Sequence, residues 1–280
     1  MIRIVVDSNA QMPPSLVDRF GITVVALPVT VDGVQYLEGV DLGADDFYAR
    51  FRSGTPEVST AQPSPGQFSV AYDGLVAAGA AEILSLHIGS SVSGTVNAAR
   101  LAAAEATVPV RVVDTGTVSF GVTFCAWAAA EALADGATAA EAAAVAERAG
   151  SRVGNVFVVR GLELARAGGR LDLTGFIDAE QAPTGVPVLS MTGGLMHVVG
   201  HAAGLEEAAD MMATEVLSGG RDLRVGVGVA DADVAPFWDA MEDRLAGAAD
   251  VREVVRYRVG PSVGAHTGPG TVGVMWAGSS

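Results

Sequence analysis

The chain has 280 residues and a formal net charge of −15, and all 17 of its basic residues are arginine. The absence of lysine excludes Schiff-base chemistry on a lysine, a pyridoxal-phosphate anchor and the lysine of a phosphate-binding P-loop. The acidic balance argues against a nucleic acid or an anionic membrane surface as a partner, because phosphate groups are bound by clustered cations.

The first 160 residues alternate short β-branched runs with longer helical patterns. We predict strands at residues 2–6, 22–27, 83–88, 110–113 and 156–159. We predict helices at residues 13–20, 45–52, 65–78, 95–106, 118–134 and 139–149. This alternation favours a mostly parallel sheet covered by helices on both faces, with functional loops at the carboxyl ends of the strands.

The pattern changes after residue 160. We predict a hairpin from residues 187–190 and 195–199, helices at 205–217 and 234–245, and strands at 223–229, 251–259 and 272–276. The fold class that we expect is α/β: a mostly parallel N-terminal α/β sandwich domain at residues 1–160, followed by a C-terminal α+β domain with a largely antiparallel sheet at residues 161–280.

Cys125 is the only cysteine, which excludes an intramolecular disulfide and a cysteine-based zinc cluster. Its apolar surroundings favour an inert buried thiol over a nucleophile. The first strand is too short for a signal sequence, and no apolar run reaches the length of about 18 residues that a membrane span needs. We therefore expect a cytoplasmic protein without integral membrane association.

The segment from Ile83 to Thr95 carries the most chemical information. A buried strand leads into a turn of serine and glycine, and an alanine-rich helix follows. The unpaired N–H groups at the helix start and the hydroxyls of the turn can bind an anion without lysine. The alternative is that Ser93 or Thr95 only caps the helix. The segment does not match the G-x-S-x-G nucleophile elbow, because Ser93 stands where the second glycine belongs.

Two further segments combine polar residues with turns. Residues 58–65 place hydroxyls before a helix that Pro65 can begin. Residues 260–270 place His266 in a loop of glycine and proline. The other histidines, at positions 87, 197 and 201, have no pattern that makes a metal site. Asp7-Ser8 and Asp114-Thr115 end two predicted strands and reach the same edge of the sheet, or they cap turns.

Taken together, these segments resemble the successive motifs of the DegV family. The resemblance covers essentially the full length of the chain in order, and it rests on Asp7-Ser8, Thr60-Ala61-Gln62-Pro63-Ser64, Ser90-Ser91-Val92-Ser93-Gly94-Thr95, Val113-Asp114-Thr115, Gly168-Gly169-Arg170 and Gly264-Ala265-His266-Thr267-Gly268-Pro269-Gly270. It implies a non-enzymatic protein of two α/β domains that binds a long-chain fatty acid, with no cofactor and no metal.

The resemblance also implies where the ligand lies. The acyl chain is expected inside the protein and the carboxylate at the interface of the two domains, held by Thr60, Ser93, Gly94 and His266. In bacterial members that work with a fatty acid kinase, the loaded protein presents the carboxylate for phosphorylation. This chain departs from the family pattern where such a kinase docks: Gly185-Val186-Pro187 replaces Ile-Lys-Pro, and a basic residue usual in the strand before the next helix is replaced in Gly200-His201-Ala202-Ala203.

The residue types leave a second hypothesis open. A serine hydrolase or acyltransferase would use Ser93 as nucleophile and His266 as base, with Asp7 or Asp114 orienting the imidazole. A third hypothesis, that the protein itself phosphorylates a ligand, is weaker because a lysine-containing phosphate loop and a clear pair of magnesium-binding carboxylates are missing from the sequence. The expected binding protein differs from both because it leaves its ligand chemically unchanged.

Overall fold

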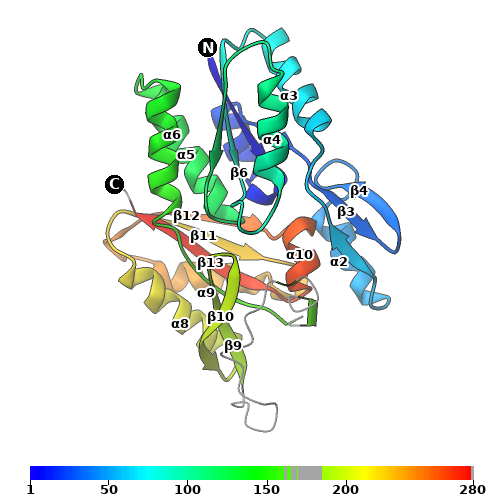
Figure 1. Ribbon diagram of the computed structural model, residues 1–280. Coiled ribbons are helices and arrows are strands. Elements are labelled where there is room, and N and C mark those ends of the chain that lie inside the picture. Colours follow the sequence, from blue (N-terminus) through cyan, green and yellow to red (C-terminus); the bar gives the residue numbers. More distant parts are fainter. Residues whose placement is uncertain (161–162, 165–168, 170–184, 279–280) are drawn as a thin grey trace. The chain divides into compact units, whose positions relative to one another are not determined.

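Figure 1 shows the computed structural model of the protein, which describes residues 1–160, 163–164, 169 and 185–278. The chain divides into two compact units. Unit 1 comprises Met1–Leu42 and Thr60–Arg152, and unit 2 comprises Gly43–Ser59 and Val153–Ser280. These units differ from the expected ranges 1–160 and 161–280 because the chain enters unit 2 early, at residues 43–59, and leaves unit 1 at residue 152.

A single helix explains why the early segment belongs to unit 2. Helix α2 (Ala44–Arg52) buries its aromatic side chains. The ring of Tyr48 lies so close to Gly264 that a Cβ atom built there would be 2.4 Å from the Tyr48 hydroxyl. Arg258 also forms an ion pair with Asp45 at the start of α2. Packing and charge therefore both attach α2 to the C-terminal half of the chain.

Unit 1 is built on a parallel sheet of four strands in the order β2-β1-β6-β7. The strands are β1 (Ile2–Asp7), β2 (Thr23–Val25), β6 (Glu82–His87) and β7 (Val110–Asp114). Its helices are η1 (Ser8–Ala10), α1 (Pro14–Phe20), α3 (Pro65–Ala77), α4 (Thr95–Ala104), α5 (Phe120–Ala134) and α6 (Ala139–Gly150).

Helices cover both faces of this sheet (Figure 1). One core lies between the sheet and α3 and α4, and the other lies between the sheet and α5 and α6. Helix α5 is apolar on nearly all sides, because it packs against both the sheet and α6. Capping boxes at Ser64 and Thr138 begin α3 and α6, so local sequence determines where these two helices start.

A small hairpin of unit 1 was not expected from the sequence. Strands β3 (Pro28–Val31) and β4 (Val34–Leu37) pair antiparallel around Asp32-Gly33. Both turn residues have positive φ, at 49° and 79°, which is the backbone that an Asp-Gly hairpin turn requires. The signal was therefore present in the sequence. Strand β5 (Val58–Thr60) completes a three-stranded sheet in the order β4-β3-β5.

Unit 2 contains a sheet of six strands in the order β10-β9-β8-β13-β11-β12. The strands are β8 (Gly154–Val158), β9 (Val186–Thr192), β10 (Leu195–Ala202), β11 (Leu223–Val229), β12 (Val251–Arg258) and β13 (Val272–Gly278). Only β11 and β12 pair in parallel, and all other neighbours are antiparallel. The expected hairpin is β9 and β10.

Among the residues that the structure describes, unit 2 includes the helices α2, α8 (Leu205–Ser218), η3 (Ala232–Val234), α9 (Pro236–Leu245) and α10 (Pro261–Thr267). Helices α8 and α9 cover one face of the sheet and bury alternate strand residues with it. The expected fold class is confirmed, because a parallel α/β layer precedes a largely antiparallel α+β layer. Within the described part of the chain, no helix combines the length and the apolar character that a membrane span requires.

Candidate functional site

The serine-rich turn of unit 1 connects β6 to α4. Helix α4 begins at Thr95, and its N-cap residue is Gly94, which has no side chain. The alternative that Ser93 or Thr95 is the N-cap residue is therefore wrong, but the Ser93 hydroxyl does satisfy the first N–H of the helix. The Thr95 backbone N–H donates to Oγ of Ser93 at 3.3 Å, and the two side-chain hydroxyls are 2.8 Å apart. Ser93 is half-buried and Thr95 is fully buried, so the turn holds an ordered pair of hydroxyls.

The Thr60 segment lies against this turn. A Cβ atom built on Gly94 would be 1.9 Å from Oε1 of Gln62, so the Gln62 amide occupies the space beside the glycine. The backbone N–H of Ala61 donates to Pro28 O at 3.0 Å and fixes the segment as it leaves β5. Two motifs that are about thirty residues apart in the sequence, one with Thr60 and one with Gly94, are thus adjacent in unit 1.

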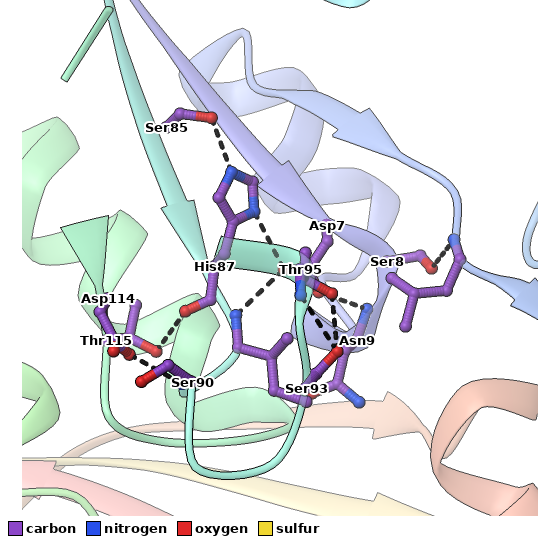
Figure 2. Close-up of polar contacts among 12 residues, drawn as sticks. Asp7, Ser8, Asn9, Ser85, His87, Ser90, Ser93, Thr95, Asp114 and Thr115 are labelled. Carbon is purple, nitrogen blue, oxygen red and sulfur yellow. Dashed lines mark hydrogen bonds and ion pairs between the residues drawn. The ribbon is translucent and has the colours of Figure 1, made fainter. Parts of the chain in front are cut away.

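A buried carboxylate, that of Asp7, lies at the start of the serine-rich turn. Asp7 ends β1 and His87 ends the neighbouring parallel strand β6, so the two residues lie at the same level of the sheet. Oδ2 of Asp7 is 3.0 Å from Nδ1 of His87 and accepts a hydrogen bond from Ile88 N–H, also at 3.0 Å. Oδ1 accepts from Asn9 N–H at 3.1 Å. Figure 2 shows these contacts at the ends of the two strands.

Two further side-chain hydrogen bonds lead from His87 into the core of unit 1. Nε2 of His87 is 2.7 Å from Oγ of Ser85, and that hydroxyl is 2.9 Å from the Tyr72 hydroxyl. The ring of Phe68 contacts the imidazole edge to face, with ring centroids 4.9 Å apart. Burial raises the pKa of Tyr72 to about 12, although its hydrogen bond to Ser85 acts in the opposite direction. Sequence reasoning assigned no role to His87, but its position one strand away from Asp7 was the available signal.

A second carboxylate holds the other side of the turn. Oδ1 of Asp114 accepts from the backbone N–H groups of Ser90 and Gly116, each at 3.1 Å. Partial burial acts to raise the pKa of Asp114, but the hydrogen bonds from Ser90 and Gly116 together lower it below its usual value. The neighbouring Thr115 donates its hydroxyl to His87 O at 2.7 Å. Asp114 and Thr115 therefore stabilise the turn through hydrogen bonds to its backbone, as the turn-capping interpretation of the sequence predicted.

His266 lies in unit 2, on α10. The sequence led us to expect a loop here, and that expectation is wrong: Pro261 supplies the first turn of a helix that runs to Thr267. Gly268 ends the helix with a φ of 75°, a conformation that favours glycine. His266 is half-buried in the last turn. Of the Gly168-Gly169-Arg170 motif, residues 168 and 170 lie outside the described residues.

The hydrolase hypothesis loses its orienting carboxylates. Asp7 is hydrogen-bonded to His87, and Asp114 is hydrogen-bonded to backbone N–H groups of the turn. Burial raises the pKa of the Cys125 thiol to about 12, which makes this sulfur a poor nucleophile. Among the described residues, no cluster of three His, Cys, Asp or Glu side chains could hold a metal ion.

Comparison with known proteins identifies the chain. A family profile described as "Uncharacterised protein, DegV family" matches residues 1–279. This chain belongs to the DegV family. A DegV domain-containing protein of Streptomyces coelicolor is 36% identical over 98% of this chain and 97% of its own length. A DegV domain-containing protein of Deinococcus radiodurans is 33% identical, with the same two coverages. The resemblance inferred from the motifs is confirmed.

Solved structures of DegV proteins have the same fold. One concerns fatty acid binding by a DegV family protein from Thermus thermophilus; it is 31% identical, has a TM-score of 0.87 and covers 99% of both chains. Another is a DegV lipid-binding protein from Thermotoga maritima, 26% identical, with a TM-score of 0.86 over 99% of this chain and 98% of that one. Both likenesses span the two units.

Proposed function

We propose that this protein binds one long-chain fatty acid and leaves it chemically unchanged. Thr60, Ser93, Gly94 and His266 hold the carboxylate at the interface of the two domains, and the acyl chain is buried. The observation that carries the proposal is the contact of Gln62 with Gly94, which brings the Thr60 and Ser93 motifs together in unit 1. The fatty-acid-binding DegV protein from Thermus thermophilus, similar over the whole chain, supports the ligand class.

The chemistry of the head group suits a site without lysine. A carboxylate exchanges water for hydrogen bonds from hydroxyls, from the first N–H groups of α4 and from an imidazole. Hydrogen bonds to a charged acceptor are roughly twice as strong as those between neutral groups. The N-cap residue Gly94 has no side chain that competes with the ligand for these donors, and the Thr95 N–H is bonded to Ser93 Oγ, which is itself part of the proposed site.

The tail supplies most of the affinity under this proposal. Each buried methylene contributes about 0.8 kcal/mol, before the costs of ordering the ligand. The head group then determines the orientation of the ligand and the preference for an acid over an ester. These two contributions can be measured separately, because a fatty acid methyl ester retains the tail but lacks the charge.

Identification of the bound lipid is the decisive experiment. We expect protein purified from a bacterial host to release a fatty acid on denaturation, detected by mass spectrometry in a ratio near one per chain. Delipidated protein should then bind added fatty acid more tightly than its methyl ester. Protein that is always empty and binds no added fatty acid would refute the proposal.

Variants test the assigned residues. The double variant Thr60→Ala with Ser93→Ala should weaken fatty acid binding and leave methyl ester binding nearly unchanged. Ser69→Ala is the matched control, because that half-buried hydroxyl on α3 donates to Pro65 O within its own helix. Unchanged acid affinity in the double variant would remove the head-group site. Labelling by a fluorophosphonate probe that Ser93→Ala abolishes would favour the hydrolase instead.

Transfer to a fatty acid kinase is the second part of the proposal. Loaded protein, mixed with a bacterial fatty acid kinase and ATP, should yield an acyl phosphate that hydroxylamine traps. Val186 lies where the family pattern has a lysine, and a second basic residue of that pattern is replaced within residues 200–203, so we expect a kinase with a less acidic docking surface to be the better partner. This reaction requires ATP and therefore a cytoplasmic location, which cell fractionation tests. Recovery of the protein outside the cytoplasm, or no acyl phosphate with any kinase of the host, would contradict this part.

A further inference from the structure

Four buried side chains form a row of hydrogen bonds that leads from the start of the serine-rich turn into unit 1. Asp7, His87 and Ser85 are fully buried, and Tyr72 is 1% exposed. Their contacts measure 3.0, 2.7 and 2.9 Å in order from Asp7 to Tyr72. The order of carboxylate, imidazole and hydroxyl resembles that of a hydrolase triad. Ser85 cannot act as a nucleophile, however, because no substrate reaches a side chain with no exposed surface.

The hydrogen bonds have one orientation that satisfies every member. An ionised carboxylate only accepts, so Nδ1 of His87 carries the proton that it donates to Asp7. Nε2 then accepts from the Ser85 hydroxyl, which in turn accepts from the Tyr72 hydroxyl. This assignment is inferred from the partners of each atom. It fixes the tautomer of His87 and leaves Asp7 able to accept a further bond from the backbone.

The hydrogen bond from the Ile88 backbone N–H to Asp7 connects these four buried side chains to the serine-rich turn. Oδ2 of Asp7, the oxygen next to His87, also accepts from Ile88 N–H, where the chain leaves β6. The carbonyl of His87 is held from the other side by the Thr115 hydroxyl. Figure 2 shows that the turn with Ser90 and Ser93 follows directly from this anchored point. The start of the turn is therefore held by two buried side chains, those of Asp7 and Thr115.

We propose that Asp7 and His87 are positioning residues for the head-group turn. The imidazole holds the Asp7 carboxylate in place, and the carboxylate holds Ile88, so that Ser93 and the first N–H groups of α4 face the ligand carboxylate. Such support is effective because hydrogen bonds to a ligand depend steeply on donor position. This inference rests on the proposed function, since it assigns the turn to fatty acid binding.

Two substitutions of His87 separate its two hydrogen bonds. The side-chain amide nitrogen of asparagine reaches the position of Nδ1 and can donate to Asp7, and the side-chain amide oxygen of glutamine can take the position of Nε2 and accept from Ser85. His87→Asn therefore keeps the donor to Asp7 and loses the contact with Ser85. His87→Gln keeps the contact with Ser85 and loses the donor to Asp7. Both variants lose the imidazole and bury an amide, so each serves as the control for the other.

The measurement is the ratio of affinities for a fatty acid and for its methyl ester, with palmitate and methyl palmitate as the probes. We expect His87→Gln to reduce palmitate affinity about tenfold or more, the effect of one charge-assisted hydrogen bond, and to leave methyl palmitate affinity nearly unchanged. His87→Asn should retain the ratio of the wild type. Ser85→Ala should also retain it, because the Asp7 contacts stay intact.

The outcomes distinguish this inference from the proposed function. Equal ratios in His87→Asn and His87→Gln, or equal weakening of both ligands, would overturn the positioning role. A wild type that binds palmitate no better than methyl palmitate would instead overturn the head-group site. If His87→Gln does not fold, Asp7→Asn provides the same test, because its single amide oxygen cannot replace both carboxylate oxygens, one of which accepts from His87 and Ile88 and the other from Asn9 N–H.

Discussion

Gln62 and Gly94 lie against each other in unit 1, and a Cβ atom on Gly94 would come within 1.9 Å of Oε1 of Gln62. The backbone of Gly94 itself is unremarkable for any residue, with φ of −75° and ψ of 4°. A side chain at this position would therefore displace the Gln62 amide, whereas the backbone of the turn itself accepts other residues. This contact couples the segment with Thr60 to the turn with Ser93.

A double-mutant cycle tests this contact. We expect Gly94→Ala to cost about 1 kcal/mol of unfolding free energy, because the new methyl group displaces the Gln62 amide. In a Gln62→Ala background the same change should cost little, giving a coupling energy of about 1 kcal/mol. Chemical denaturation measures all four proteins. A coupling energy indistinguishable from zero would show that the two residues do not contact each other in solution.

Two helical glycines should respond to alanine in opposite directions. A Cβ atom on Gly150 would lie 2.2 Å from Thr115 O, a backbone atom that cannot move aside. Gly74, on α3, has no atom within 4 Å of the added carbon. We expect Gly150→Ala to destabilise by about 1–3 kcal/mol and Gly74→Ala to stabilise by about 0.5–1 kcal/mol. Thermal unfolding gives both values, and changes of the same sign would contradict this packing.

Asp114 should contribute to stability at neutral pH and lose this contribution in acid. Its pKa is lower in the folded protein than its ordinary value, because hydrogen bonds from Ser90 and Gly116 outweigh partial burial. The unfolded chain therefore binds more protons in acid, and stability falls as pH decreases below about 4. Asp114→Asn should give a flatter stability curve in that range. Asp73→Asn, which removes one exposed charge from α3, is the control, and an equally steep curve in Asp114→Asn would exclude the predicted role.

The thiol of Cys125 should not react with thiol reagents in the native protein. The side chain is fully buried and the pKa of its thiol is raised to about 12 by that burial, so almost no thiolate forms at neutral pH. We expect no reaction with a thiol reagent until the protein is unfolded by denaturant. Ser53→Cys, at an exposed position, provides a rapidly reacting comparison. Fast native-state labelling of Cys125 would mean that α5 opens readily.

Local patterns in the sequence predicted most of the secondary structure. Helices α3 and α6 begin at capping boxes, and strands β1 and β7 follow from β-branched runs, because these signals act within a few residues. The β3 and β4 hairpin was missed despite its Asp32-Gly33 turn. The His266 segment was taken for a loop because glycine and proline disfavour helix interiors, whereas Pro261 stands at the first turn, where proline is tolerated.

The sequence by itself determined the family, through motifs that match in order, and the fold class, through the change from strand-helix alternation to antiparallel pairing. Only the tertiary structure decided which distant residues meet. It joins α2 to unit 2, Gln62 to Gly94 and His87 to Asp7. Helix and strand signals depend on neighbours along the chain, but these contacts depend on strand order and packing, which no local pattern contains.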